Sequence, residues 1–294
     1  MRKKAGKLLR LKKPYRLECL LRPGLHLSDK KFRRLHRQVL DVASDCFDEI
    51  PRYQIMVGTR EEWSDKVVAF AWRRDGKLAG FCSTVILWIP GVGKILHLGL
   101  TCVRKSDRSA GLTHMLTKKA IGAYLVRHKP VGKLWISNCA AVLSSLGNVA
   151  KHFKDIYPAP GGLAAPRVEH FLIAAAINTA YRKKIYIMDD AIFDADNFVF
   201  RGSVKDTVFQ KSDEDARFHH RQQGLNDYYR GLMDFENGDE VLQIGYASTF
   251  AQLSYQLRRK VRMRKAQKTA AAAPGIPDYG YARERPDAGS RLNA

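Results

Sequence analysis

The residues best suited to chemistry lie in one short loop, Arg108-Ser109-Ala110-Gly111-Leu112-Thr113. The apolar run at 94–103 predicts a strand before the loop, and residues 112–128 show helical spacing after it. At the N-terminus of a helix several backbone N–H groups lack an acceptor, and the helix dipole is positive. Small residues at that point let a diphosphate approach the amides closely. The loop is therefore predicted to bind a diphosphate, with a purely structural strand–loop–helix turn as the alternative.

Several elements upstream must hold this loop in place. Residues 15–21 predict a first strand, and Ser28 is a suitable N-cap for the helix that follows. The clearest hairpin consists of 67–73 and 77–87 around a turn that contains Asp75-Gly76.

The elements predicted downstream alternate between strands and helices. They are a strand at 133–138, a helix at 141–155, a helix at 166–182, a strand at 197–202, a helix at 224–235 and a strand at 240–248. This order predicts an α/β fold with a mixed central sheet, antiparallel and then parallel, flanked by helices. One domain is expected over 15–250, with a basic arm at 1–14 before it, and a basic helix at 251–268 and a disordered tail at 269–294 after it.

The charge of the chain is concentrated at its two ends. Lys and Arg number 51 against 29 Asp and Glu, which gives a net charge of +22. Residues 1–37 carry a net +12 and residues 258–268 a net +7, so the rest carries only +3. Such ends are typical of solvated arms, and otherwise of segments that bind nucleic acid, anionic lipid or an acidic protein.

The cysteines indicate neither a disulfide framework nor a metal site. All five are widely spaced, without a CxxC pair or a Cys/His cluster. A reducing cytosol fits this usage best, and no metal is expected. The N-terminus lacks the apolar core of a secretory signal, and the apolar run at 171–177 is too short to span a bilayer. A soluble cytoplasmic protein is therefore expected.

In this context the loop resembles the signature of the GNAT acyltransferase superfamily. That signature is Gln/Arg-x-x-Gly-x-Gly/Ala after the fourth strand, and it stands here as Arg108-x-x-Gly111-x-Thr113, with Thr as a departure in the last place. The resemblance covers 15–157 well and 160–248 loosely. It implies a GNAT-like sheet with core motifs at 67–157, helical insertions within 160–235, and 197–202 and 240–248 as the last two strands of the family.

The resemblance also implies a donor site for acetyl-CoA or another acyl-CoA. The backbone of the fourth strand would bind pantetheine, the loop amides would hold the pyrophosphate, and an N–H near Leu100–Thr101 would form the oxyanion hole. The positions that match the family's donor site are Cys102, Val103, Arg108, Ser109, Ala110, Gly111, Leu112, Thr113 and Asn138.

The resemblance suggests three residues for proton transfer. His97 occupies the strand position of the family's glutamate base, and an imidazole of ordinary pKa near 6.5 suits a base at neutral pH. The alternative is a histidine with a structural hydrogen bond. The family's tyrosine acid would fall at Ser145, so Ser145 or the later Tyr157 is expected to serve the departing thiolate, unless Tyr157 only packs in the core.

Three functions remain open from the sequence. The first is transfer of an acetyl group from coenzyme A to an amine by direct attack in a ternary complex. The second is transfer of a longer acyl group from acyl-CoA or from an acidic acyl carrier protein, which basic ends would attract. The third is a non-enzymatic nucleic-acid binder on the same core. The basic ends favour an anionic acceptor or partner, and the family often forms homodimers.

Overall fold

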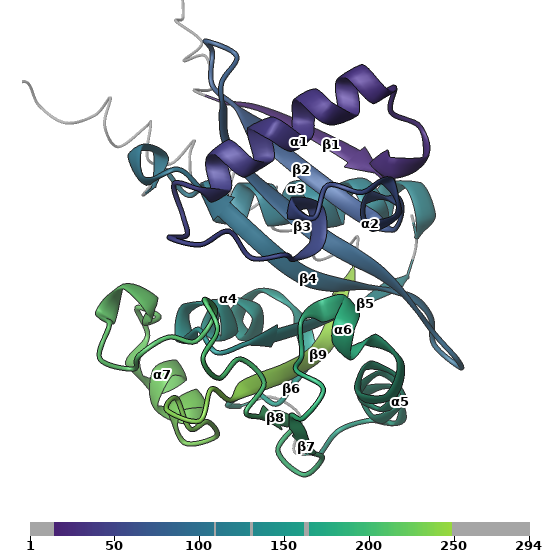
Figure 1. Cartoon of the computed structure of the whole chain (residues 1–294). Coiled ribbons are helices and arrows are strands. Elements are labelled where there is room, and N and C mark those ends of the chain that lie inside the picture. Colours follow the sequence, from purple (N-terminus) through teal and green to yellow (C-terminus); the bar gives the residue numbers. More distant parts are fainter. Residues whose placement is uncertain (1–14, 109, 130–131, 162–164, 249–294) are drawn as a thin grey trace, which may run out of the picture. The chain divides into compact units, whose positions relative to one another are not determined.

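The computed structural model describes residues 15–108, 110–129, 132–161 and 165–248. The arm at 1–14, the basic helix at 251–268 and the tail at 269–294, all expected from the sequence, lie outside the described residues. The strands are β1 (Arg16–Leu21), β2 (Lys66–Trp72), β3 (Leu78–Ile89), β4 (Gly93–Val103), β5 (Lys133–Ala140), β6 (Lys154–Tyr157), β7 (Ile192–Asp194), β8 (Val199–Arg201) and β9 (Glu240–Ser248). The helices are α1 (Asp29–Ala43), α2 (Arg60–Ser64), α3 (Leu112–His128), α4 (Leu143–His152), α5 (Val168–Ala176), α6 (Arg182–Ile185) and α7 (Gln223–Arg230), with a π-helical turn at Ile177–Tyr181 (Figure 1).

Within the described ranges the nine strands form one mixed sheet. Its order is β1-β2-β3-β4-β5-β9-β8-β7, and β6 also pairs with β9. The first four strands are antiparallel neighbours, whereas β4 and β5 run parallel. This arrangement confirms the α/β fold with an antiparallel-then-parallel sheet that the sequence predicted.

The end of the sheet differs from the prediction. The helix expected over 141–155 ends at His152, and β6 follows it at once. The backbone leaves the helical region at Phe153, which is extended (φ −112°, ψ 171°), and Asp155 then has a positive φ of 48°. β6 and β8 then lie in succession along one edge of β9, with Tyr157 opposite Ile244 and Val199 opposite Val241. The sequence predicted that 197–202 and 240–248 are the last two strands. In the structure β8, which lies within 197–202, pairs with only part of β9, and β6 pairs with another part.

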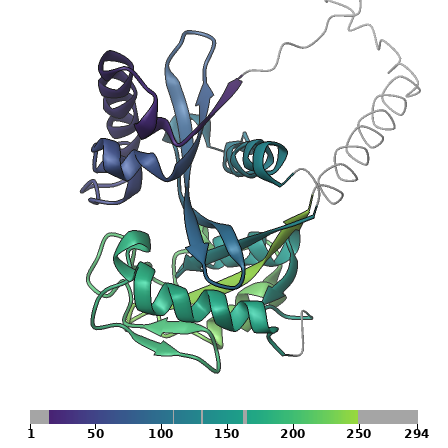
Figure 2. The same cartoon turned by 90° about the vertical axis from the view of Figure 1, so that its right-hand side faces the viewer.

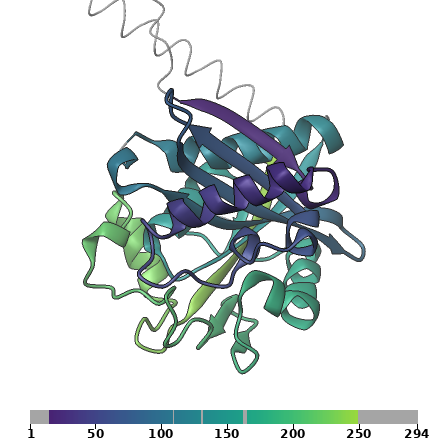
Figure 3. The ribbon, with the colours of Figure 1, turned by 45° about the horizontal axis from the view of Figure 1, so that its top comes forward.

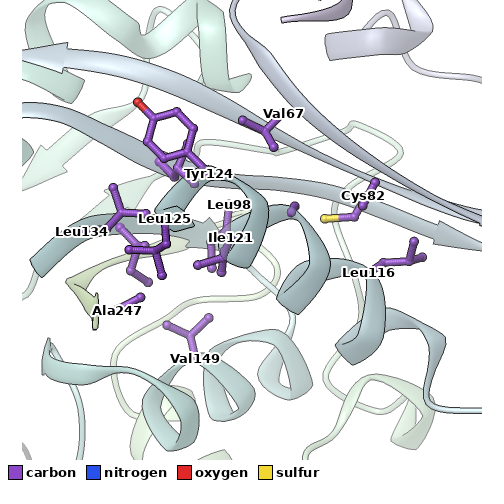
Figure 4. Packing of buried hydrophobic residues seen from close by; sticks show 14 of the residues in the cluster. Val67, Cys82, Leu98, Leu116, Ile121, Tyr124, Leu125, Leu134, Val149 and Ala247 are labelled. Atoms are coloured by element: carbon purple, nitrogen blue, oxygen red, sulfur yellow. The ribbon is translucent and has the colours of Figure 1, made fainter. Parts of the chain in front are cut away.

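Helices cover both faces of the sheet. On one face α3 and α4 pack against strand residues. Helix α1 lies on the opposite side of β1–β4 from α3 (Figure 2). Tyr124, Leu125 and Ile121 of α3 lie against Leu98 and Leu134 of the sheet (Figure 4).

On the other face α1 and α2 cover β1–β4, while α5 packs beside β3 and β9 (Figure 3). Ser28 is the N-cap of α1 as predicted, but its hydroxyl accepts no hydrogen bond from the first turn of that helix.

Candidate active site at the divergence of two parallel strands

Strands β4 and β5 pair over only three residues and then separate. The paired residues are Leu96 with Ile136, His97 with Ser137, and Leu98 with Asn138. Both strands continue beyond this point, β4 to Val103 and β5 to Ala140. Between these strand ends the backbone of β4 has an edge without a neighbouring strand, which an extended ligand can pair with.

A bulge in β4 causes the separation. Cys82 of β3 pairs with Thr101, but Thr84 pairs with Leu98, so Gly99 and Leu100 together oppose Ser83. One extra residue in a strand bends it away from its neighbour. Gly99 leaves room for the side chain of Gln54, since a Cβ at position 99 would lie 2.5 Å from Oε1 of Gln54 and would displace that carboxamide.

Successive residues of β4 direct their backbone N–H and C=O groups alternately toward β3 and toward the open edge. The amide of Arg104 donates to the carbonyl of Ala79 at 2.9 Å, so Arg104 and Cys102 direct their backbone groups toward β3. Thr101 and Val103 direct theirs the other way, toward the divergence. Among the two residues predicted to bind pantetheine, Val103 faces the open edge and Cys102 does not. The carbonyl of Val103 already accepts from Sγ of Cys46 (3.4 Å) and Nε of Arg108 (3.4 Å).

The predicted diphosphate loop leads directly from this edge to α3. Gly111 is the N-cap of α3 in the left-handed conformation (φ 69°), and a Cβ on it would meet no atom within 4 Å. The first intrahelical bond runs from Met115 to Gly111, so the amides of Leu112 and Thr113 precede the ladder. The space beside the Cα of Gly111 is thus open, and the amides of Leu112 and Thr113 have no intrahelical acceptor, while anion binding at this point stays a prediction. Ser109 lies outside the part of the chain that the structure describes, while Ala110 is exposed beside Gly111.

A buried carboxylate, Asp107, lies directly before the loop. Asp107 accepts from the hydroxyl of Tyr15 (2.8 Å) and from Nε of Arg73 (3.1 Å to each oxygen). Burial opposes the charge of Asp107, but the hydrogen bonds from Arg73 and Tyr15 lower its pKa below the ordinary value. Arg73 also donates to the hydroxyl of Ser106 at 2.6 Å. Ser106 and Asp107, just before the loop, are thus tied to Tyr15, which precedes β1, and to Arg73 of the β2–β3 hairpin.

A pair of thiols lies behind the loop. Cys46 and Cys102 form a thiol–thiol hydrogen bond, which is the main reason that the pKa of Cys46 is lowered. Arg108 lowers the pKa of Cys46 further, while the pKa of Cys102 is raised by the same hydrogen bond and by burial. Cys46 is therefore the thiol of the two that ionises first.

His97 is more deeply buried than its expected role as a base requires. Its side chain is 1% exposed, and Nδ1 lies 3.0 Å from the hydroxyl of Ser137. Burial lowers the pKa of His97 to about 3, in place of the ordinary value near 6.5 that the sequence suggested. An imidazole with this pKa stays neutral and has little affinity for an ammonium proton. The geometry therefore favours the alternative, a histidine with a structural hydrogen bond.

Tyr157 lies in the same row of the sheet as His97, but far from the divergence. The row runs from His97 through Ser137 and Ile244 to Tyr157, so three strand spacings, roughly 14 Å, separate its ends. The hydroxyl of Tyr157 donates to the carbonyl of Asp196 at 3.2 Å. Its ring contacts Phe198 and His170, which agrees with the packed alternative.

The two other predicted residues beyond β4 have different surroundings. Ser145 is half-buried in the first turn of α4, which begins shortly after the diverging end of β5. Asn138 is buried, and its amide donates to Oε1 of Gln243 at 3.1 Å. Gln243 in turn donates to the hydroxyl of Tyr229 at 2.6 Å. The side chain of Asn138 is thus part of a structural network between β5, β9 and α7.

The sequence analysis missed one titratable residue, Glu240. It begins β9, two residues before Leu242, which pairs with Cys139 at the diverging end of β5. Its carboxylate accepts from the hydroxyl of Ser203 (2.6 Å) and from Sγ of Cys139 (3.7 Å). Burial raises the pKa of Glu240 to about 7. A carboxylate of this pKa can accept a proton near neutral pH. The available sequence signal was an acidic pair, Asp239-Glu240, directly before an apolar strand.

Aromatic rings lie beside this carboxylate. Burial raises the pKa of Tyr53, and the charge of Glu240 raises it further, so the two groups are electrostatic neighbours. The ring of Tyr53 contacts those of Tyr186 and Phe209, with centroids 5.4 and 5.6 Å away. Half-buried Leu100 of the bulge packs against the same cluster. The tyrosine that senses the charge of Glu240 is therefore itself packed in an apolar cluster.

Two further searches concern the described residues only. In that part of the chain no three His, Cys, Asp or Glu side chains are grouped so that they could hold a metal ion. None of its helices has both the length and the apolar character needed to cross a membrane.

Comparison with solved structures finds proteins described as acetyltransferases. One is a GNAT-family acetyltransferase from Desulfovibrio desulfuricans, with 15% identity and a TM-score of 0.31 over 42% of this chain and 73% of that one. A ribosomal-protein-alanine N-acetyltransferase from Brucella melitensis has 19% identity and a TM-score of 0.28 over 38% and 73%. AtaTR bound with AcCoA has 10% identity and a TM-score of 0.35 over 49% and 87%. No family model matches the chain, and no curated protein matches it.

Proposed function

We propose that this protein is an acyl-CoA-dependent N-acyltransferase that moves an acetyl group from coenzyme A to an amine. The observation that carries the proposal is the divergence of β4 from β5 at the Gly99–Leu100 bulge. This divergence lies between an open helix N-terminus at Gly111 and a buried carboxylate at Glu240 with a pKa near neutrality. One end thus suits a diphosphate, and the other end suits a group that must lose a proton.

Acyl-CoA would bind as a substrate along the open edge of β4. The amides of Leu112 and Thr113 would receive the pyrophosphate, together with the backbone at Ala110 and Gly111. The pantetheine amides would pair with Thr101 and Val103, as an added strand pairs with a sheet edge. The thioester carbonyl would then lie at the bulge, where an N–H near Leu100–Thr101 can stabilise its developing negative charge.

The reaction would proceed by direct attack. The amine nitrogen forms a bond to the thioester carbon, and the intermediate collapses with cleavage of the carbon–sulfur bond. Glu240 accepts the proton that the amine loses, because its pKa of about 7 lets a large fraction of it be ionised at neutral pH. Ser145, in the first turn of α4, is the proposed hydrogen-bond donor to the departing thiolate of coenzyme A.

The basic ends of the chain suggest that the protein binds an acidic partner or an anionic acceptor substrate. Residues 1–37 and 258–268 carry most of the net charge. We propose that they attract an acidic partner or an anionic acceptor by long-range steering, which salt weakens. An acidic acyl carrier protein, a nucleic acid and an anionic lipid surface all fit this charge.

Titration calorimetry with acetyl-CoA tests the donor site. Gly111→Asp places a carboxylate where the diphosphate would lie, and it is expected to weaken binding about a hundredfold or more. Gly76→Asp is the matched control, because Gly76 also has positive φ (83°) and open space around its Cα, but lies in the β2–β3 turn. Equal affinity of wild type and Gly111→Asp would overturn the loop assignment.

A further inference from the structure

Two of the five cysteines meet where the end of α1 packs against β4. Cys46 lies just after the last turn of α1 and is half-buried, whereas Cys102 belongs to β4 and is 2% exposed. Both thiols are free, and a hydrogen bond joins them. The sulfur atoms of a disulfide lie about 2 Å apart, so a small approach of two thiols already in contact is enough to form one.

Further hydrogen bonds hold the two segments together at this point. Sγ of Cys46 donates to the carbonyl of Val103, the residue after Cys102, at 3.4 Å. The carboxylate of Asp45 accepts from the amide of Lys105 at 2.8 Å. The chain on either side of the two thiols is thus bonded across the same junction, so the thiols stay in contact in the folded protein.

The surroundings of Cys46 favour the thiolate, which is the reactive form of cysteine. The hydrogen bond with Cys102 and the charge of Arg108 outweigh burial and lower the pKa of Cys46 to about 6. Nε of Arg108 lies 3.4 Å from the same carbonyl of Val103 that Cys46 contacts, which places the guanidinium beside the sulfur. The same hydrogen bond and burial raise the pKa of Cys102. At neutral pH the pair therefore consists of one thiolate and one thiol.

The three other cysteines lack this combination. Burial raises the pKa of Cys82 and Cys139, and it raises that of Cys19 to about 12. Cys82 also packs in the cluster beneath α3, on the opposite face of the sheet from Cys102. All five cysteines lie in the described ranges, so a thiolate in contact with a second thiol occurs at Cys46 and Cys102 alone.

We propose that Cys46 is a peroxide-reactive thiol and that Cys102 converts its oxidised form to a disulfide beside the donor loop. The thiolate of Cys46 attacks one oxygen of a hydroperoxide and the O–O bond breaks. The other oxygen takes a proton from solvent and leaves as an alcohol or as water, so Cys46 becomes a sulfenic acid. The sulfur of Cys102 then attacks that of Cys46, the S–O bond breaks, and the departing hydroxide leaves as water with the thiol proton. The two thiols lose two electrons, and the peroxide receives them.

The disulfide would change two contacts at the start of the donor loop. Cys46 could no longer donate a hydrogen bond to the carbonyl of Val103, and its negative charge beside Arg108 would be lost. The oxidation itself consumes a peroxide and no acyl-CoA. It therefore does not depend on the proposed function.

Peptide mass spectrometry of the full-length chain tests the proposal. The reduced protein is treated with hydrogen peroxide near neutral pH, and free thiols are blocked with N-ethylmaleimide. Trypsin then releases 38–52, which contains Cys46, and 95–104, which contains Cys102. The expected product is a linked pair of these two peptides that dithiothreitol separates. Cys46 should lose its thiol at least about tenfold faster than Cys19, because Cys46 is ionised at this pH and Cys19 is not.

Substitutions separate the roles of the two thiols. Cys46→Ser should abolish the linked peptides. Cys102→Ala should leave Cys46 as a sulfenic acid, which dimedone traps as an adduct. Cys82→Ala is the matched control, because it also removes a buried thiol, and it should leave the linked peptides in place.

A second pair of variants tests the activation of Cys46. Arg108→Gln should slow the oxidation of Cys46 about tenfold, because a cation no longer favours the thiolate. Lys105→Gln removes a cation at an exposed position nearby and should leave the rate unchanged.

Three results would overturn the proposal. A disulfide from Cys46 to a second copy of the chain would mean that Cys102 is not its partner. Sulfinic acid at Cys46 of the wild type, without linked peptides, would exclude Cys102 as the resolving thiol. Equal rates of thiol loss at Cys46 and Cys19 would show that Cys46 has no special reactivity toward peroxide. All three are read from the wild type, so the decision does not require any variant to fold.

Discussion

Leu98 and Asn138 form the last residue pair between β4 and β5, although both strands continue past it. The pair lies directly before Gly99, the first residue of the bulge opposite Ser83. The bulge is thus the local cause of the divergence, and the divergence provides the unpaired backbone edge on which the proposed acyl-CoA site depends.

The first prediction concerns Glu240 as the base. Glu240→Gln is expected to lower kcat/KM about a hundredfold to ten-thousandfold, the usual contribution of a positioned general base. In the wild type kcat/KM should rise with pH through a limb near 7, where Glu240 ionises, and the variant should lack this limb. The measurement is the pH profile of both proteins with one primary amine. A limb that persists in Glu240→Gln would assign the base elsewhere.

A second prediction follows from the same carboxylate and concerns stability. The pKa of Glu240 is about 7 in the folded protein against 4.5 for an ordinary glutamate, so between these values the folded state binds more protons than the unfolded state. The free energy of unfolding should therefore fall as pH rises from 4.5 to 7, by about 3 kcal/mol from this group. Glu240→Gln should remove that part of the slope and be more stable than wild type at pH 8. The free energy of unfolding of both proteins is measured by urea unfolding at pH 5 and pH 8. An equal change in this free energy between the two pH values would contradict the raised pKa of Glu240.

The third prediction concerns His97, whose effect on the free energy of unfolding depends on pH in the opposite direction to that of Glu240. Burial lowers its pKa to about 3, so between pH 6.5 and 3 the unfolded state binds more protons. Because of His97, the free energy of unfolding should therefore fall as pH falls through this window. In His97→Asn this free energy should fall less over the same window. Because His97 stays neutral, the variant should also keep the activity limb near pH 7. Loss of that limb in His97→Asn would restore His97 as the base.

The donor loop should depend on its anchor at Asp107. Arg73→Lys removes the two-pronged contact of the guanidinium with Asp107 and its bond to Ser106, and is expected to raise the Kd of acetyl-CoA about tenfold. Lys77→Arg, an exchange of one cation for another at an exposed position of the same hairpin, is the control and should bind as wild type does. Calorimetric titration of both variants decides the matter, and equal affinities would mean that the loop needs no such anchor.

The parts of the fold that the sequence predicts well are those with local signals. The helical spacing of 112–128 and the apolar run of 240–248 correspond to α3 and β9 residue for residue. The Asp75-Gly76 turn likewise marks the β2–β3 hairpin. Each of these signals comes from residues adjacent in sequence, so no tertiary information was needed.

The candidate site could be predicted only in part, because its acceptor side is assembled from distant segments. Glu240 receives hydrogen bonds from Ser203 and from Cys139, which is 101 residues away, and its raised pKa arises from burial that only the tertiary fold creates. The same burial makes His97 a neutral residue. Cys46 and Cys102 likewise carry no sequence pattern, since only the tertiary fold brings the two thiols into contact.

The most direct measurement of the central claim is thermal unfolding of the purified full-length chain with acetyl-CoA, free coenzyme A or palmitoyl-CoA. Acetyl-CoA at 100 times its Kd should stabilise the protein by about 2.7 kcal/mol, and free coenzyme A should also raise the midpoint because it carries the same diphosphate and pantetheine. A shift with palmitoyl-CoA alone would favour a long-chain acyl donor over acetyl-CoA. An unchanged midpoint with all three ligands would contradict the acyl-CoA site and favour nucleic-acid binding through the basic ends.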